Sequence, residues 1–356
     1  LPSRGGSKKI HTTMQKDGRL STLWRAFFER HPRLDWIRKW GVSIASLAMG
    51  LVTLLVFRRG VEYFPLFVGY LLLVWLAGVV FVGAREKLTG RAPRALSTAI
   101  DYTVQTLLHG LLLFLLPIYY ASTTLGSGNE WLLIALVAAA GLTTVDPWYR
   151  AVVARAPWTE VGLFWVGLFA SLNAALPLVG MSTEWVLLLG GSLSVLSLLP
   201  AGRRHLRISW AQAVLRVTLG AALFGVCLWW ARAWVPPVPL YLTRATFARA
   251  VEQLEPVDPV VRISSQELLA WGRLAAFTAI AAPSGLTEPI YHVWLKNGNT
   301  VGEMLLTTIR GGRRGGFRTY SWKTDLGVDP TGLWQVDVRT VHGQLVGRLR
   351  LVVTSP

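Results

Sequence analysis

Charged residues are scarce in this chain. They make up 15% of its 356 residues, whereas soluble globular proteins carry about 25%. Acidic side chains are scarcer than basic ones, with 19 Asp and Glu against 36 Lys and Arg, so the formal net charge is +17. The single cysteine, Cys227, excludes a disulfide within the chain and a metal site built from several thiolates. Because Cys227 lies in an apolar segment, we expect it to be a small buried hydrophobic residue.

The sequence also lacks the motifs of the common enzyme classes. It contains no G-x-S-x-G, no H-E-x-x-H and no phosphate-binding loop that ends in Gly-Lys-Ser or Gly-Lys-Thr. Three acidic residues cluster just before Pro259, and we interpret them as part of a solvated loop. We therefore predict no catalytic residue and no metal site, expect no cofactor, and favour a protein without enzymatic activity.

Apolar runs, by contrast, dominate the chain up to Trp234. Hydrophobic residues make up 52% of the sequence and tryptophans number 17, and membrane–water interfaces favour tryptophan. A helix of about 20 apolar residues spans a bilayer with its backbone groups bonded internally. We predict a multipass α-helical membrane bundle of about seven transmembrane helices over residues 41–234. The predicted segments are 41–57, 63–83, 99–121, 131–146, 158–180, 183–201 and 212–234.

Basic residues are sorted unevenly among the connections between these segments. The N-terminal segment 1–40 carries ten Lys and Arg against three acidic residues, and no short apolar core with a cleavage site follows close behind it, so we do not expect a signal peptide. This segment and every second connection bring about 20 basic residues to one side, against two on the other. The positive-inside rule therefore predicts a bacterial inner-membrane protein with a cytoplasmic N-terminus that binds anionic lipid headgroups. Seven crossings would then place the C-terminal part in the periplasm.

The composition changes after Trp234. A proline-rich linker, 235–240, precedes residues 241–356, in which charges return and turn signals recur. In IYHVWLKNGNTVGEMLLTTI two alternating apolar runs flank Asn-Gly, the strongest short hairpin signal, and a second turn is expected at His342-Gly343. We interpret residues 268–280 as one long strand or a strand pair. Several short strands separated by turns predict a small all-β sandwich domain.

The order of short motifs in this domain resembles a known family. YLTRATFARAVEQLEPVD (241–258), YHVWLKNG (291–298), FRTYSWKT (317–324), GLWQVDV (332–338) and GQLVGRLRLVV (343–353) resemble a bacterial family, the domain of unknown function DUF2914. The matching residues are Arg244, Ala245, Glu255, Pro256, His292, Trp294, Arg318, Thr319, Ser321, Gly332 and Trp334, and Phe317 replaces the family's usual tryptophan. The resemblance covers about a third of the chain. It implies a periplasmic β-domain associated with membrane segments, and it implies no activity.

The sharpest polar feature of the predicted helices lies on the segment 99–121. Asp101, Gln105 and His109 follow one another at a spacing of four and therefore share one helix face. Ionisable groups within a bilayer usually face the bundle interior or a cavity. One interpretation is a neutral histidine hydrogen-bonded to a neighbouring helix; the others are a proton relay, or a ligand to haem or another pigment. His109 is thus the candidate cofactor-binding residue, and Asp101 and Gln105 belong to a candidate polar site.

A basic, glycine-rich stretch, RGGRRGGFRTYSW (310–322), looks like a nucleic-acid-binding sequence. The predicted topology places it outside the cytoplasm, so we predict no nucleic acid partner and interpret RGGRRGG as a loop whose glycines permit positive φ. It is either a solvated basic loop or a contact for an anionic partner: lipid headgroups, a sugar polymer or an acidic protein face. The candidate contact residues of the domain are Arg310, Arg313, Arg314 and Arg318, together with Trp294 and Trp334.

Architecture and composition together favour one function. We expect a non-enzymatic inner-membrane protein whose periplasmic β-sandwich mediates interaction or assembly with an envelope or membrane protein complex, through its edge strands and its basic loop. Two alternatives stay open. One is a channel, transporter or membrane enzyme that uses the polar residues of the third helix, and the other is an accessory subunit of a pigment- or haem-containing membrane complex.

Overall fold

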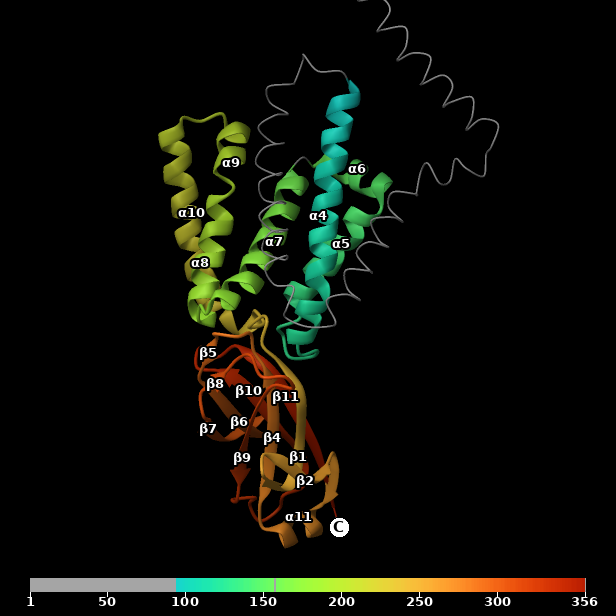
Figure 1. Ribbon diagram of the computed structural model, residues 1–356, viewed down its shortest axis with the longest axis vertical. Coiled ribbons are helices and arrows are strands. Elements are labelled where there is room, and N and C mark those ends of the chain that lie inside the picture. Colours follow the sequence, from blue (N-terminus) through green and yellow to red (C-terminus); the bar gives the residue numbers. More distant parts are fainter. Residues whose placement is uncertain (1–93, 157, 356) are drawn as a thin grey trace, which may run out of the picture.

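The computed structural model of the protein describes residues 94–156 and 158–355. The predicted basic segment 1–40 and the predicted helices 41–57 and 63–83 lie outside these residues. Figure 1 shows a helical part and a β-domain stacked along the long axis of the molecule, with several helices ending where the β-domain begins.

Five helices alternate in direction through the helical part (Figure 1). α4 (Arg94–Ser122), α7 (Trp158–Ala175) and α10 (Trp210–Trp230) run toward the β-domain, whereas α5 (Trp131–Thr144) and α8 (Thr183–Leu196) run away from it. The short elements that join them are α6 (Asp146–Arg155), α9 (Leu199–Leu206), η2 (Leu176–Val179) and η3 (Arg232–Trp234). Each of the five falls largely in a segment that the sequence predicted to be an apolar helix.

The prediction of seven transmembrane helices is nevertheless wrong. Three helices of the described part are long and apolar enough to cross a membrane: α4 over Gln105–Ser122, α7 with η2 over Trp158–Val179, and α10. α5 and α8 have 14 residues each, which at 1.5 Å per residue is about 21 Å, short of a hydrocarbon core of about 30 Å. α5 would form a fourth span only together with α6, at a bend of 102°. Apolar composition overstated the helical length of the segments 131–146 and 183–201.

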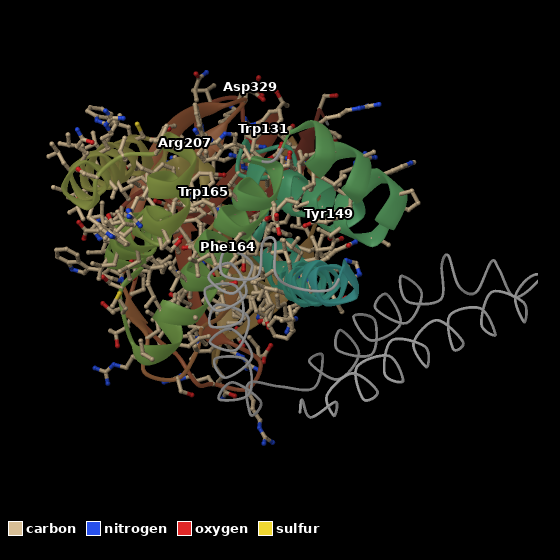
Figure 2. All side chains as sticks on the ribbon, turned by 90° about the horizontal axis from the view of Figure 1, so that it is seen from above. Trp131, Tyr149, Phe164, Trp165, Arg207 and Asp329 are labelled. Atoms are coloured by element: carbon tan, nitrogen blue, oxygen red, sulfur yellow. The ribbon has the colours of Figure 1, made fainter. Side chains whose placement is uncertain are left out.

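Small residues let these helices pack closely. α7 lies between α4 and α5 on one side and α8 and α10 on the other, as the view along the helices in Figure 2 shows. A Cβ atom on Gly191 of α8 would lie 2.3 Å from a methyl group of Leu228 in α10, so a larger residue there would displace the Leu228 side chain. Trp165 of α7 donates its indole N–H to the hydroxyl of Ser194 in α8 at 3.1 Å. The described helices therefore form one bundle.

The outer surface of the bundle is apolar. α10 exposes four large aliphatic side chains in succession: Leu215, Leu219, Leu223 and Val226. Cys227, which we expected to be buried, is exposed on the same helix. The prediction for Cys227 is wrong because an apolar segment without an amphipathic pattern does not indicate which face of the helix is buried.

Exposed tryptophans gather at the two ends of the helices. Trp131, Trp185, Trp229, Trp230 and Trp234 belong to the ends near the β-domain, and Trp148, Trp158 and Trp210 to the opposite ends. α10 carries Trp210 in its first turn and Trp230 in its last. Its 21 residues rise about 30 Å, which is the thickness of a hydrocarbon core.

Residues 241–354 form a β-sandwich, as the sequence predicted. One sheet has the order β2-β1-β4-β9 and the other β3-β11-β10-β6-β7, and a two-stranded sheet pairs β5 with β8. The strands are β1 (Tyr241–Glu252), β2 (Glu255–Val260), β3 (Arg262–Ser264), β4 (Leu274–Ala281), β5 (Thr287–Glu288), β6 (Ile290–Lys296), β7 (Asn299–Leu305), β8 (Ile309–Arg310), β9 (Phe317–Lys323), β10 (Gly332–Thr340) and β11 (Leu345–Thr354). All pairs are antiparallel except β3 with β11, which are parallel.

Both predicted hairpins are present. Asn297 and Gly298 have φ angles of 51° and 85° and connect β6 to β7, as an Asn-Gly turn does in a tight hairpin. Gly343, with φ of 85°, turns β10 into β11. Residues 268–280, in contrast, are neither one long strand nor a strand pair, because α11 (Ser265–Trp271) precedes β4. Ser264 caps this helix by accepting a hydrogen bond from the Glu267 amide.

Candidate functional site

The polar face of α4 binds the end of the neighbouring helix α5. Gln105 Nε2 donates to the carbonyl oxygen of Thr143 at 3.2 Å, and His109 Nδ1 lies 3.1 Å from the Thr143 hydroxyl. That hydroxyl donates its one proton to carbonyl oxygens of α5, so it accepts from Nδ1–H of the histidine. Asp101 lies in α4, and its side chain is not among those described.

This arrangement joins two helices and holds no metal site. Among the side chains that the structure describes, which leave out Asp101, Asp146 and His205, no group of three or more His, Cys, Asp or Glu is placed to hold a metal ion. Gln105 and His109 are brought together as the sequence predicted, and their shared partner is the backbone and hydroxyl of one threonine. Binding of a pigment or haem at His109 stays a prediction.

The basic loop follows β8 and leads into β9. Gly312, Gly315 and Gly316 have φ angles of 80° to 89°, which is the conformational freedom that the sequence indicated for this loop. Arg310, Arg313 and Arg314 are exposed. Arg318, in contrast, pairs with Glu255, which also binds Arg244 at 2.8 Å.

The loop lies at the end of the sandwich that faces the helices. Arg310 pairs with Thr287 in the β5–β8 sheet, and Gly312 N donates to the carbonyl oxygen of Ala282 at 3.0 Å. The turn that contains Ala282 reaches the connection between α7 and α8: a Cβ atom on Gly180 would lie 3.4 Å from the Gly285 carbonyl oxygen. The sequence placed the loop between strands but could not place it at this end.

A buried carboxylate fixes the sandwich to the start of α8. Glu288 of β5 accepts hydrogen bonds from the backbone N–H of Thr183 at 3.3 Å and from its hydroxyl at 3.1 Å. A carboxylate at a helix N-terminus is stabilised by the helix dipole. Burial raises the pKa of the Glu288 carboxyl above its usual value, and the hydrogen bonds from Thr183 oppose this effect.

The β10–β11 turn reaches the ends of α8 and α10. His342 Nε2 lies 3.0 Å from a carboxylate oxygen of Glu184, and the His342 carbonyl oxygen accepts from Arg232 Nε at 2.6 Å. The buried side chain of Gln344 donates to the carbonyl oxygen of Val235 at 3.1 Å. The turn is therefore held by both the helix α8 and the segment that follows α10.

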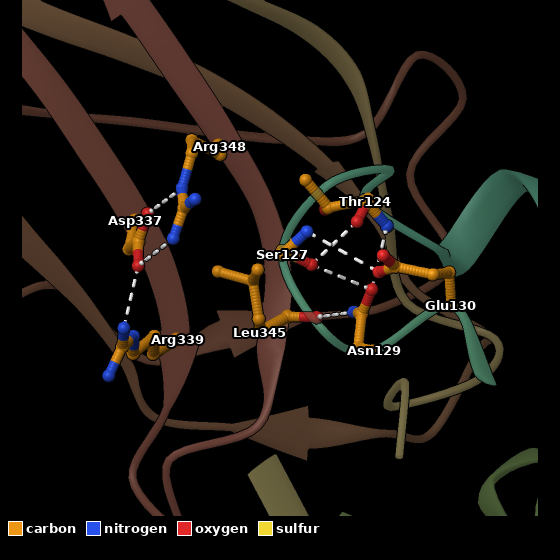
Figure 3. A network of polar contacts seen from close by, with 8 residues as sticks. All are labelled: Thr124, Ser127, Asn129, Glu130, Asp337, Arg339, Leu345 and Arg348. Atoms are coloured by element: carbon orange, nitrogen blue, oxygen red, sulfur yellow. Dashed lines mark hydrogen bonds and ion pairs between the residues drawn. The ribbon is translucent and has the colours of Figure 1, made fainter. Parts of the chain in front are cut away.

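A third contact comes from the connection between α4 and α5. Asn129 is fully buried, donates to the carbonyl oxygen of Leu345 at 3.2 Å and accepts from Thr124 N at 3.0 Å. The Glu130 carboxylate accepts from the backbone N–H of Ser127 (Figure 3) and from that of Gly128, which closes the turn. We call these three contacts, centred on Glu288, His342 and Asn129, the junction.

A buried ion pair stiffens the hairpin beside the junction. Asp337 of β10 is fully buried and binds Arg348 of β11 through two hydrogen bonds, with Arg348 Nη2 2.9 Å from Asp337 Oδ2 (Figure 3). Arg339 adds a third contact at 2.6 Å. The Asp337 carboxylate raises the pKa of the Arg348 guanidinium. These contacts hold β11, which begins at Leu345, in register with β10.

The sandwich core contains a polar chain that links the two sheets. Trp294 Nε1 donates to Ser321 Oγ at 3.0 Å, and Ser321 Oγ lies 2.8 Å from His292 Nδ1. His292 Nε2 lies 3.1 Å from Thr278 Oγ1, which donates to the carbonyl oxygen of Thr319 at 3.5 Å. Thr278 thus accepts from Nε2–H, and Ser321 donates to Nδ1. With these roles a neutral ring has a complementary partner at each of its two nitrogens.

Burial keeps this histidine neutral and places the motif tryptophans in the core. His292 is fully buried, and burial lowers its pKa to about 3. Trp294 and Trp334 are also buried, with ring centroids 6.5 Å apart in an edge-to-face arrangement. The residues that carry the DUF2914 resemblance therefore include the core that holds the sandwich together. Trp294 and Trp334 lie inside it rather than on a contact surface.

The remaining motif glycine also has a structural reason. Gly332 opens β10 with a φ of 119°, and a Cβ atom there would lie 2.4 Å from Asn297 Oδ1. That oxygen accepts from Leu333 N at 2.8 Å. The β6–β7 turn and the start of β10 are packed so closely that no side chain fits between them.

Two family models match the chain, and together they cover most of it. The model described as a family of unknown function, DUF5924, matches residues 19–275. The model described as a protein of unknown function, DUF2914, matches residues 287–353, which confirms the resemblance for the motifs from His292 onward. The motif 241–258 lies in the region of the first model. No curated protein and no solved structure matches the sequence.

The junction residues escaped sequence reasoning. Glu288 and Asn129 stand in short polar connections that carry no recognisable motif. Thr183 and Glu288 are 105 positions apart, and Asn129 and Leu345 are 216 apart. The only available signal was indirect, namely that the helix connections on the side of the sandwich are short.

Proposed function

Because the chain belongs to the DUF5924 family, whose function is unknown, no activity follows from its membership, and we propose a function from the structure. The protein is a non-enzymatic bacterial inner-membrane protein. Its β-sandwich is held on the periplasmic side and mediates interaction or assembly with an envelope or membrane protein complex. The single observation that carries this proposal is the junction, which fixes a folded binding domain to the ends of apolar helices.

The membrane location is supported by the surface of the bundle. α4, α7 and α10 are long and apolar enough to cross a bilayer, and α10 exposes leucines along its length. Exposed tryptophans at both helix ends are typical of the aromatic belts at the two interfaces of a membrane. An apolar outer surface between two such belts is stable in lipid and unfavourable in water.

The orientation is supported by the distribution of charge. The helix ends opposite the sandwich carry Arg155, Arg203 and Arg207. The connections 123–130 and 180–182, on the side of the sandwich, contain no lysine or arginine, and Arg232 after α10 is the exception. The positive-inside rule then assigns the far ends to the cytoplasm and the sandwich to the periplasm.

Cysteine labelling in intact cells tests this orientation. With Cys227→Ser as the background, Val328→Cys places a thiol at a site that is 99% exposed on the sandwich. We expect a membrane-impermeant maleimide to label it without lysis. Leu206→Cys, exposed at the far ends of the helices, is the matched control and should be labelled only after lysis. The reverse pattern would contradict the proposed orientation.

The edge of the second sheet offers the contact surface. β7 is the last strand of its sheet and exposes Val301 and Leu305, the latter at 61%. Edge strands with exposed apolar side chains are common sites for the addition of a partner. Val261, directly before the opposite edge strand β3, and Val352 of the neighbouring strand β11 are exposed and provide a comparison on the other side of the sheet.

Partner recovery tests the interaction. We expect a defined partner to co-purify with the full-length protein from native membranes in mild detergent. The double variant Val301→Glu and Leu305→Glu should recover about tenfold less of this partner, because each introduced charge would lose its water in the contact. The variant Val261→Glu and Val352→Glu should recover the partner as the wild type does. A chain cut after Pro239 should recover none. If that shortened chain keeps the same partner, the sandwich is not the contact.

A further inference from the structure

The basic loop presents three arginines that form no ion pair with an acidic residue of the described part of the chain. Arg310, Arg313 and Arg314 are exposed, and none of the ion pairs among the described residues includes them. Arg318 and Arg244 share Glu255 instead. The guanidinium of Arg313 lies 4.6 Å over the ring of Phe317, which holds it beside the start of β9. The loop therefore carries an uncompensated charge of about +3 at one place on the sandwich.

The loop is fixed at the level of the helix ends. Gly311 N donates to the carbonyl oxygen of Leu286 and Gly312 N to that of Ala282, both at 3.0 Å. The turn 282–286 contacts Gly180 between α7 and α8. Trp185 stands in the first turn of α8 and Trp230 in the last turn of α10, and both are exposed at this same level. Exposed tryptophans of this kind mark the headgroup layer when helices cross a membrane.

From this position we infer that the basic loop binds the phosphate groups of anionic phospholipids in the periplasmic leaflet. This inference rests on the proposed membrane-spanning function. An arginine guanidinium binds a phosphate through two parallel hydrogen bonds, and a surface of anionic lipid attracts basic residues that lie near it. A Cβ atom on Gly312 would lie 2.7 Å from Ser284 Oγ and one on Gly316 would lie 3.0 Å from the Ile280 backbone, so these glycines pack the loop against the sandwich and fix its position. The loop thus seats the sandwich on the membrane next to the junction.

The occupant is lipid rather than an acidic protein for a geometric reason. The loop lies on the side of the sandwich toward the helices, beside the junction, and not on the distal edges that a soluble partner reaches first. A macromolecule bound there would have to enter the headgroup layer, whereas lipid phosphates already occupy it. Three arginines match the charge of a few anionic headgroups.

The test is a titration of the full-length protein in uncharged detergent with phosphatidylglycerol that carries brominated acyl chains. Bound brominated lipid quenches nearby tryptophans, and Trp185 and Trp230 lie at this level. Brominated phosphatidylcholine of the same chain length is the zwitterionic comparison. We expect Arg310→Gln, Arg313→Gln and Arg314→Gln together to weaken phosphatidylglycerol binding on the order of 100-fold, about fivefold for each arginine, and to leave phosphatidylcholine binding unchanged.

A matched variant separates the loop from net charge. Arg249→Gln, Arg262→Gln and Arg273→Gln together remove the same charge from exposed arginines of the sandwich outside the basic loop, and this variant should bind phosphatidylglycerol as the wild type does. Unchanged binding by the loop variant, or equal loss in both variants, would overturn the assignment. So would loss of an acidic protein partner from the loop variant with unchanged lipid binding.

Alkaline carbonate extraction of native membranes distinguishes this inference from the function on which it rests. Retention of the wild type together with unchanged lipid binding by the loop variant overturns only the lipid site. Release of the wild type by carbonate overturns the membrane-spanning proposal itself.

Discussion

Replacement of His292 by alanine is expected to lower the free energy of unfolding of the sandwich by about 4 kcal/mol. The change removes the acceptor of the Ser321 proton and the donor to Thr278, and it leaves a cavity between two sheets in a fully buried position. Denaturant unfolding of the full chain, followed by the near-ultraviolet circular dichroism of Trp294 and Trp334, measures the loss.

The pH dependence shows whether the histidine acts as a neutral hydrogen-bonding group. The pKa of His292 in the folded state is about 3, below the ordinary value of 6.5. Between these two pH values the histidine is protonated in the unfolded chain and neutral in the folded chain. The stability that His292 contributes is complete above pH 6.5 and is lost as the pH falls toward 3. Between pH 6.5 and 5 the wild type should lose about 2 kcal/mol relative to His292→Gln, which has no such proton. Parallel pH profiles for the two proteins would contradict this account.

Replacement of Glu288 by alanine should open the junction without unfolding the sandwich. Thr183 would lose the acceptor for both its N–H and its hydroxyl, at a cost of about 3 kcal/mol in buried surroundings. Hydrogen exchange of the Thr183 amide and its neighbours in α8 should then rise on the order of 100-fold. Glu267→Ala, at an exposed glutamate in the distal helix α11, is the matched control and should leave exchange at the junction unchanged.

The Glu288→Gln variant tests the role of the charge. Burial raises the pKa of this carboxyl in the folded state, so the protonated form contributes stability that is present below the unfolded pKa and is lost as the pH rises through the folded pKa. Glutamine carries no charge; its single oxygen can accept from the Thr183 N–H, and its amide N–H₂ can donate to the Thr183 hydroxyl. We expect it to retain junction protection and to remove the pH dependence. An equal rise in exchange for the alanine and glutamine variants would show that the carboxylate itself, with its charge and two acceptor oxygens, closes the junction, because glutamine has the same shape.

Local patterns predicted those parts of the fold that local chemistry determines. The Asn-Gly turn after Lys296, the alternating strands on either side of it and the positive φ angles of three of the four RGGRRGG glycines follow from residues close together in the sequence. The end of α5 was also readable. Pro147 occupies the first turn of α6, a position that favours proline and marks the start of a new helix, and the extended Val145 separates this helix from α5. Counting apolar residues across this boundary produced the excess helix length.

Other features could not be predicted because their causes lie elsewhere in the chain. α11 carries a readable start signal, Ser264 with Glu267 three residues later, but the apolar run that follows fits a strand equally well. The junction joins segments more than 100 positions apart, so no window of sequence contains it. Which side of α10 faces outward depends on the helices packed against it. Because its sequence has no amphipathic pattern, the buried side cannot be predicted from it.

The boundary between the two family matches falls inside the β-sandwich and not between the helices and the sandwich. The first match ends at residue 275, inside β4, and the second begins at residue 287. β9 pairs with β4 alone, and β4 pairs with β1, so a DUF2914 segment by itself lacks the strands that complete one of its two sheets. A protein that carries that segment without the DUF5924 part must therefore borrow equivalent strands from another stretch of its own chain or from a second polypeptide. Truncated or fused versions of such proteins should therefore be divided before Tyr241. At this point the chain passes from the helices to the sandwich, and a cut there leaves both sheets complete.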